Sequence, residues 1–196
     1  MSADIKVVGL EALRKHFAPG AVAIRMRRHG RRAMAKNVSL GAGAIKKSIA
    51  SGQYAGNHKV TTSIKQSAKP LVATGALFKS IQGRVLKWDE GVVGVVKNRR
   101  VKDADGRSND LLSIAAVLYF GATIKVTEKM RRFFAVMSRL YPGRYYPIRA
   151  STKVIVVPPR KFLDAALDDA VVKKYVDNWQ KAVFLTIFKV KGGQRG

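Results

Sequence analysis

The stretch that decides the fold is Pro70-Leu-Val-Ala-Thr74-Gly75-Ala-Leu77-Phe78-Lys-Ser80-Ile81. Pro70 fixes its own φ angle and lacks a backbone donor, so the chain enters this stretch extended rather than helical. Thr74 and Gly75 then offer a capping oxygen and a flexible backbone position just before an apolar turn. The pattern predicts a short helix that leads into a sheet.

Strand patterns follow this stretch. Residues 83–88 and 92–98 are predicted strands, and Asp89-Glu90-Gly91 between them is typical of a tight turn in which glycine takes a positive φ. A further strand is predicted within residues 145–157, which end in the β-branched run Val154-Ile155-Val156-Val157 before Pro158-Pro159. We therefore expect one small antiparallel sheet of about four strands.

Apolar residues at helical spacing predict helices on both sides of these strands. They cover residues 5–17 and 21–37 before the sheet, and 127–141 and 160–188 after it. Leu111–Phe120 is apolar nearly all round, so we expect it to be buried, as a helix or as a central strand, and its modest β-branched content favours the helix. The prediction is a single α+β domain over residues 1–196, with N-terminal helices and a long C-terminal helix flanking the sheet.

Three segments lack a core-forming pattern. Residues 39–69 are rich in Gly, Ala, Ser and Thr and are predicted to be a mobile loop or arm, although the preceding helix could extend through Ile45 and Ile49. Residues 99–110 form a charged insertion. Residues 189–196 are predicted to form a flexible basic tail.

The charge of the chain is its most unusual property, a formal net charge of +26. Between Ala12 and Trp88, sixteen basic residues occur without one acidic residue. Such a segment repels itself and is predicted to face a polyanion or an acidic protein surface, a solubilising face being the alternative. In the helix predicted over 21–37 the basic residues gather on one side, and the candidate contacts are Arg25, Arg27, Arg28, Arg31, Arg32 and Lys36.

No residue pattern indicates catalysis, a cofactor or a metal. The chain has no cysteine, and none of its three histidines has a carboxylate at ligand spacing. Asp103-Ala-Asp105-Gly106 lacks the further ligands of a calcium loop, and residues 41–48 lack the glycine that precedes Lys-Ser in a phosphate-binding loop. With no signal-peptide pattern and no membrane-length apolar run, we expect a soluble protein that is not an enzyme.

The order Pro-Leu-x-x-Thr-Gly-x-Leu-x-x-Ser-Ile at residues 70–81 resembles a motif of the tail-completion and virion-morphogenesis proteins of tailed phages, especially their Mu-like branch. Three more segments follow in that family's order, and they are Leu118-Tyr119-Phe120-Gly121, Tyr146-Pro147-Ile148-Arg149-Ala150 and Val157-Pro158-Pro159-Arg160-Lys161-Phe162-Leu163-Asp164. One departure is Val72-Ala73, where the family is usually acidic. The insertion at 99–110 fits the Mu-like branch.

The resemblance implies a structural virion protein, assembled in the host cytoplasm, that forms a ring at the head–tail junction around the DNA channel. Its partners would be copies of itself, most often six to a ring, together with adjacent neck and tail-tube proteins and DNA. The motif residues would shape the subunit core and place the C-terminal helix; they are Thr74, Gly75, Leu77, Ser80, Ile81, Phe120, Gly121, Pro158, Pro159, Arg160, Phe162 and Leu163. Charge supports an alternative equally well, a nucleic-acid-binding protein without sequence preference.

Overall fold

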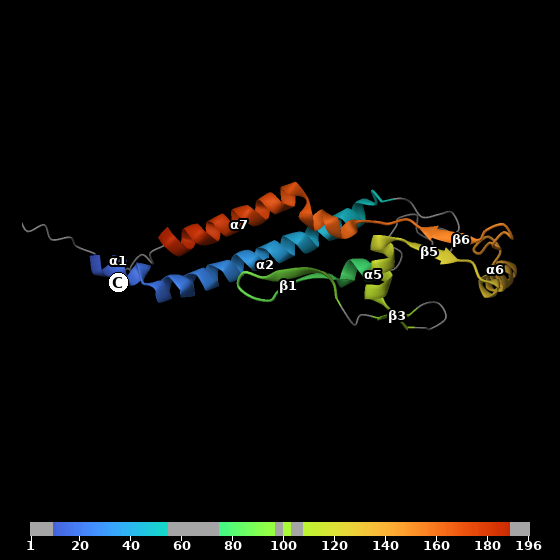
Figure 1. Cartoon of the computed structure of the whole chain (residues 1–196), viewed down its shortest axis with the longest axis horizontal. Helices are drawn as coiled ribbons and strands as arrows, with labels where there is room; N and C mark the ends of the chain where they lie inside the picture. Colours follow the sequence, from blue (N-terminus) through green and yellow to red (C-terminus); the bar gives the residue numbers. More distant parts are fainter. Residues whose placement is uncertain (1–9, 55–74, 97–99, 103–107, 189–196) are drawn as a thin grey trace, which may run out of the picture.

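The computed structural model describes residues 10–54, 75–96, 100–102 and 108–188. These residues form an elongated rod, in which long helices occupy one half and short strands and helices extend from the other (Figure 1). The α+β class predicted from the sequence is confirmed, with helices at both ends of the chain and short antiparallel strands between them. The first helix, α1, covers Leu10–Phe17, and the earlier part of the helix predicted over 5–17 lies outside the described residues.

Helix α2, Pro19–Ser51, is the axis of the rod and, with 33 residues, is about 50 Å long. Pro19 sits in its first turn, where a missing donor costs nothing, and Gly52 ends it with a left-handed φ of 69°. The helix was predicted to end at residue 37, with an extension through Ile45 and Ile49 as the alternative. The alternative is confirmed, and the loop expected from residue 39 is wrong as far as residue 51. The helix continues because Val38, Ala42, Ile45 and Ile49 recur at helical spacing and are buried. Residues 55–69 lie outside the described residues.

The helix predicted over 160–188 is interrupted. A 3₁₀ turn, η1, covers Phe162–Leu167, and helix α7 covers Asp169–Phe188. Asp168 between them has a ψ of 137°, and its Oδ1 accepts a hydrogen bond of 3.0 Å from the backbone N–H of Ala170. The aspartate therefore caps the start of α7, which runs back antiparallel along α2 (Figure 1).

The central stretch forms helix α4, Ala76–Ser80, followed by a hairpin of β1, Ile81–Val85, and β2, Gly91–Val95. The hairpin packs one face against α2, where a Cβ on Gly91 would lie 2.5 Å from Val38 Cγ1. The sequence prediction that Gly91 supplies a positive φ is wrong, because Gly91 is not among the described glycines with that conformation. Glycine is required there for close approach to the helix.

The remaining strands form separate ladders. Strand β3, Arg100–Lys102, pairs with β4, Ser108–Asp110, inside the segment predicted to be a charged insertion. Strand β5, Ala122–Lys125, pairs with β6, Val154–Val157. Within the described part of the chain, three two-stranded ladders thus replace the expected sheet of about four strands. Helix α5, Leu111–Phe120, lies between the hairpin and the β5–β6 ladder and keeps them apart (Figure 1).

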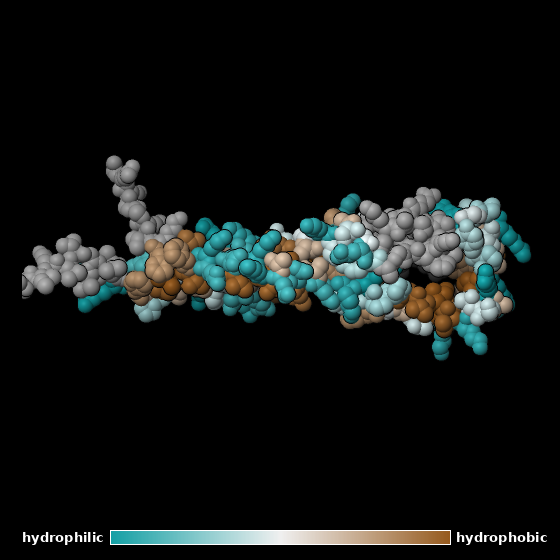
Figure 2. All heavy atoms as spheres, turned by 90° about the horizontal axis from the view of Figure 1, so that it is seen from above, coloured by the Kyte–Doolittle hydropathy of each residue, from teal (hydrophilic) through white to brown (hydrophobic). Residues whose placement is uncertain are grey.

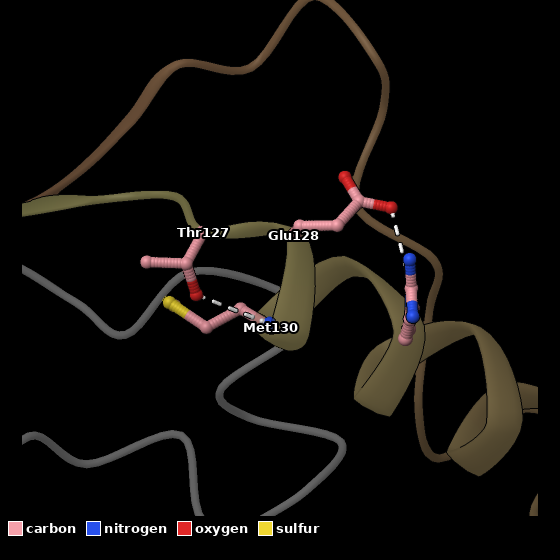
Figure 3. A network of polar contacts seen from close by, with 4 residues as sticks. Thr127, Glu128 and Met130 are labelled. Atoms are coloured by element: carbon pink, nitrogen blue, oxygen red, sulfur yellow. Dashed lines mark hydrogen bonds and ion pairs between the residues drawn. The ribbon is translucent and has the colours of Figure 1, made fainter.

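Two predicted helices appear beyond the hairpin. Leu111–Phe120 is helical as predicted, but the expectation that it is buried is wrong, because only Leu111 and Ala115 are buried and Phe120 is 71% exposed. Helix α6, Glu128–Leu140, forms within the range predicted and lies at the far end of the rod. Thr127 caps it by accepting a 3.2 Å hydrogen bond from the Met130 N–H, and Glu128 pairs with Arg132 at 3.4 Å (Figure 3).

Candidate nucleic-acid or acidic-surface interface

The third side of α2 is covered by neither α7 nor the hairpin. Gly30, Ala33 and Asn37 face α7, whereas Val38 and Ala42 face the hairpin side. The exposed basic residues of the remaining side define what we call the cationic face; they are Arg28, Arg32, Lys36 and Lys47. Arg27 and Arg31 are exposed as well, but they lie at nearly the same angle around the helix as Val38. The face exists because small or apolar residues line the other two sides of the same helix.

The cationic face has no carboxylate partner among the residues that the structure describes. The ion pairs among the described residues are Lys87 with Glu90 at 3.0 Å and Arg132 with Glu128 at 3.4 Å, and neither involves a residue of α2. Helix α2 itself contains no Asp or Glu. The charges therefore add to one positive potential along the helix, suited to phosphates or to a surface rich in carboxylates.

Arg25 does not belong to this face, although the sequence placed it there. It is half-buried; its Nε donates to the Thr186 carbonyl at 3.1 Å, and its Nη2 donates to the His16 carbonyl. Thr186 lies on α7 and His16 on α1, so Arg25 holds three helices together. The His16 ring, hydrogen bonded at 2.8 Å to the Ile187 carbonyl, supports the same junction. Arg25 is thus a structural residue, and the other five predicted contacts are exposed.

Lys47 was missed by the sequence prediction, as was its neighbour Lys46. Lys47 is exposed, and Lys46 is half-buried with its ammonium 5.7 Å from the centroid of the Phe78 ring. Both fell in the segment predicted as a loop. Lys47 stands eleven positions, about three helical turns, after Lys36. The sequence therefore places Lys47 on the same side of the helix as Lys36 once the helix is extended through Ile49.

Most residues of the central motif lie in the core of the protein. Leu77, Ser80 and Ile81 are buried, and the Ser80 hydroxyl donates to the Leu77 carbonyl at 2.6 Å. Gly75 has a φ of 64° and occupies the capping position of α4, which was predicted for Thr74. Thr74 itself lies outside the described residues.

The segment 157–164 reaches the same core from the other end of the chain. Phe162 is fully buried and clusters with Leu77, Ile81 and Ile45. Arg160 is buried, its backbone N–H donates to the Leu118 carbonyl at 2.9 Å, and burial lowers the pKa of its guanidinium. Among the other motif residues, Leu163 and Pro158 are half-buried and Pro159 is exposed.

The motif residues Phe120 and Gly121 are placed differently from each other. Phe120 projects into solvent, whereas Gly121 has a φ of 78° at the end of α5. A Cβ on Gly121 would lie 2.8 Å from the Val157 carbonyl oxygen, so glycine is needed both for the turn and for contact with the 157–164 segment. The hydroxyl of Tyr119 donates to Asp164, which joins the two segments again and raises the pKa of Tyr119.

The described residues do not support metal binding or a phosphate-binding loop. No group of three or more His, Asp or Glu is placed to hold a metal ion within the described ranges. Residues 41–48, which were compared with a phosphate-binding loop, lie inside α2, so their backbone N–H groups are used in the helix. Asp103 and Asp105 fall outside the description. No described helix is long and apolar enough to span a membrane.

Comparison of the chain with protein-family models, curated proteins and solved structures finds no match.

Proposed function

We propose that this chain is a structural subunit of a tailed-phage virion, which forms a ring at the neck around the DNA channel and has no catalytic role. The proposal rests first on the motif order described above. Three of the four motif segments meet in space, because Ile81 and Phe162 share one buried cluster against which Leu118 and Tyr119 pack. Segments more than eighty residues apart in sequence thus form one core.

Exposed apolar surface is the observation that carries the oligomeric part of the proposal. Helix α7 buries one side against α2 and exposes a second apolar side, which we call the α7 stripe; it consists of Val172, Val176, Val183, Phe184, Ile187 and Phe188. A groove of 520 Å³ runs along most of these residues. Soluble monomers rarely expose so continuous an apolar surface, and such a patch marks an interface.

Further apolar side chains are exposed at the other end of the rod. They include Phe133, Val136 and Leu140 on α6 and Val154 and Val156 on β6. Figure 2 shows hydrophobic patches toward both ends of the rod, separated by a largely hydrophilic middle. Apolar surface at both ends of the subunit supports contacts with neighbours at both ends, which a ring can provide.

The cationic face gives the proposed ring a function for its charge. A ring around a channel that DNA crosses needs a surface that holds the phosphate backbone without reading bases. Arginines and lysines along one straight helix can contact phosphates in this way, and nothing in their pattern indicates base readout. The same face would serve equally well against an acidic neighbouring protein.

A second candidate function follows from the same face alone. The protein would then be a sequence-nonspecific nucleic-acid-binding protein that works outside any virion. The absence of described carboxylates beside Arg28, Arg32 and Lys36 favours it as much as it favours the ring.

Binding to phage tails assembled without this protein separates the two functions. Purified protein is incubated with such tails, the tails are sedimented, and the bound copies are counted and imaged. The neck proposal predicts a fixed number of copies at one end of each tail at physiological salt. Binding to free DNA that disappears as salt rises, without any binding to tails, would contradict it and support the second function.

A further inference from the structure

The hairpin has a free hydrogen-bonding edge. Val96 N–H donates to the Ser80 carbonyl and Leu86 N–H to the Glu90 carbonyl, so the even-numbered residues of β2 are bonded to β1. The N–H groups of Val93 and Val95 consequently point away from β1. Neither has a backbone partner in the part of the chain that the structure describes. An edge of this kind is a template for another strand.

Strand β6 has a free edge as well. Val126 N–H donates to the Lys153 carbonyl, which makes Ile155 and Val157 the residues bonded to β5. The N–H and carbonyl groups of Val154 and Val156 therefore point outward, without a backbone partner among the described residues. The side chain of Val156 is 65% exposed. A two-stranded ribbon with exposed valines is marginal on its own and gains stability from further strands.

A trough lies beside the free edge of β2. It has a volume of 530 Å³, within the range of about 300–1,000 Å³ that binding pockets have, and Gly91 and Val93 of β2 line one side. Met34 and Val38 of α2 lie along it, and Tyr175 and Trp179 of α7 line the other side. The trough is mostly apolar, so an uncharged strand can enter it without burying a charge.

The sequence Val154-Ile155-Val156-Val157 has the chemistry that this trough requires. Lys153 directly before it would bring a positive charge toward Asp164, the carboxylate that lines the trough. Within one copy the two edges cannot meet, because α5 lies between the hairpin and β6 (Figure 1). A β6 edge that enters the trough therefore belongs to a second copy of this chain.

We propose that β6 of one copy pairs with the free edge of β2 in the next copy, which joins the two ladders into one four-stranded sheet across the subunit boundary. The contact uses two different surfaces, so it is heterologous, and its repetition builds a ring when the rotation between neighbours closes. This inference rests on the proposed function, since it names the contact that builds the proposed ring.

Proline at residue 156 tests the pairing with little effect on the subunit itself. Val156→Pro removes an N–H that points away from β5, and Ile155 before it is already extended. Val156→Thr keeps the N–H and the shape and serves as the matched control. We expect Val156→Pro to weaken self-association about tenfold or more in sedimentation velocity, with Val156→Thr close to wild type. Equal association of both variants would overturn the pairing.

Cross-linking provides a second readout that does not depend on proline. The chain has no cysteine, so a short thiol cross-linker can join Gly94→Cys on β2 to a single cysteine on β6. Val156→Cys lies on the same sheet face as Gly94→Cys if the two strands run parallel, and Ile155→Cys does so if they run antiparallel. One of these two double variants should give a series of covalent oligomers on denaturing gels, and each single variant should not. If the wild-type protein forms a ring but no double variant gives cross-linked oligomers, the strand pairing is overturned and the proposed function still stands. A wild-type chain that neither self-associates nor binds tails would overturn both.

Discussion

Trp88 at the tip of the hairpin and Trp179 on α7 meet edge to face over Gly30 of α2, with ring centroids 6.1 Å apart and ring planes at 75°. A Cβ on Gly30 would lie 2.7 Å from Trp88 Cε3 and 3.1 Å from Trp179 Cζ3. The hairpin and α7 thus contact each other and the central helix at a residue without a side chain. This junction fixes how the two elements flank the trough.

Replacing Gly30 with alanine should therefore destabilise the protein, although alanine is the better helix former. We expect Gly30→Ala to lower the free energy of unfolding by about 1–3 kcal/mol, because the aromatic pair must move apart. Gly43→Ala is the matched control, since nothing lies within 4 Å of its Cβ position in the same helix. It should raise the free energy by about 0.5–1 kcal/mol. Urea unfolding measures both, and changes of the same sign would contradict the packing described.

The hairpin offers a similar pair of glycines. A Cβ on Gly83 would lie 2.5 Å from the Val38 carbonyl oxygen, whereas Gly94 on the outer face of the hairpin has nothing within 4 Å. Gly83→Ala should lower the thermal midpoint by several degrees, as a loss of about 1–3 kcal/mol would, and Gly94→Ala should leave it nearly unchanged. If Gly83→Ala were tolerated equally well, the hairpin would not approach α2 as closely as described.

The raised pKa of Tyr175 leads us to expect that the free energy of unfolding falls at alkaline pH. The Tyr175 hydroxyl donates to the Ala166 carbonyl at 3.0 Å, and burial raises its pKa above the ordinary value of 10.0. Above about pH 10 the unfolded chain loses this proton more readily than the folded chain, so the stabilisation is complete below that pH and is lost as pH rises. In chemical unfolding between about pH 9 and 11, the free energy of unfolding of Tyr175→Phe should decline less with pH than that of wild type. The difference should match the titration of a single group. An identical decline in both proteins would show that Tyr175 does not contribute.

The cationic face predicts a change in salt dependence. Replacing Arg28, Arg32 and Lys36 together by glutamine should reduce the slope of log affinity for duplex DNA against log salt by about 0.9 for each lost phosphate contact. The control removes three exposed charges from the other end of the rod, namely Lys125, Lys129 and Arg139. Fluorescence anisotropy from low to physiological salt measures both variants. Equal losses would mean that net charge matters and the face does not.

The sequence predicted those parts of the fold that depend on local pattern. The helix at Glu128–Leu140 follows from Thr127 as its cap and from its amphipathic spacing, and the hairpin follows from Asp89-Glu90-Gly91 between two β-prone runs. The extension of α2 to Ser51 was only the alternative prediction, through Ile45 and Ile49, because its glycines and serines weaken a helix by propensity. Packing outweighs that propensity, since Gly41 lets Tyr175 and Val93 approach the helix.

Tertiary contacts also decided the outcome at the candidate site. Arg25 and Arg28 look alike in the sequence, yet Arg25 joins α1, α2 and α7 by contacts with His16 and with Thr186, which lies 161 positions away. The apolar run Leu111–Phe120 was expected to be buried because it has no polar side. Leu112, Val117 and Phe120 are exposed in the described structure, an outcome of tertiary packing that pattern alone does not reveal.

Native mass spectrometry of the purified protein tests the central claim most directly, with Phe184→Asp as the companion variant. Phe184 lies in the α7 stripe and is 59% exposed, so the substitution should leave the subunit folded. The account predicts one discrete closed oligomer for wild type, alone or seated on tails, and its loss in Phe184→Asp. A wild-type protein that remains monomeric both in solution and in the presence of tails would contradict the account.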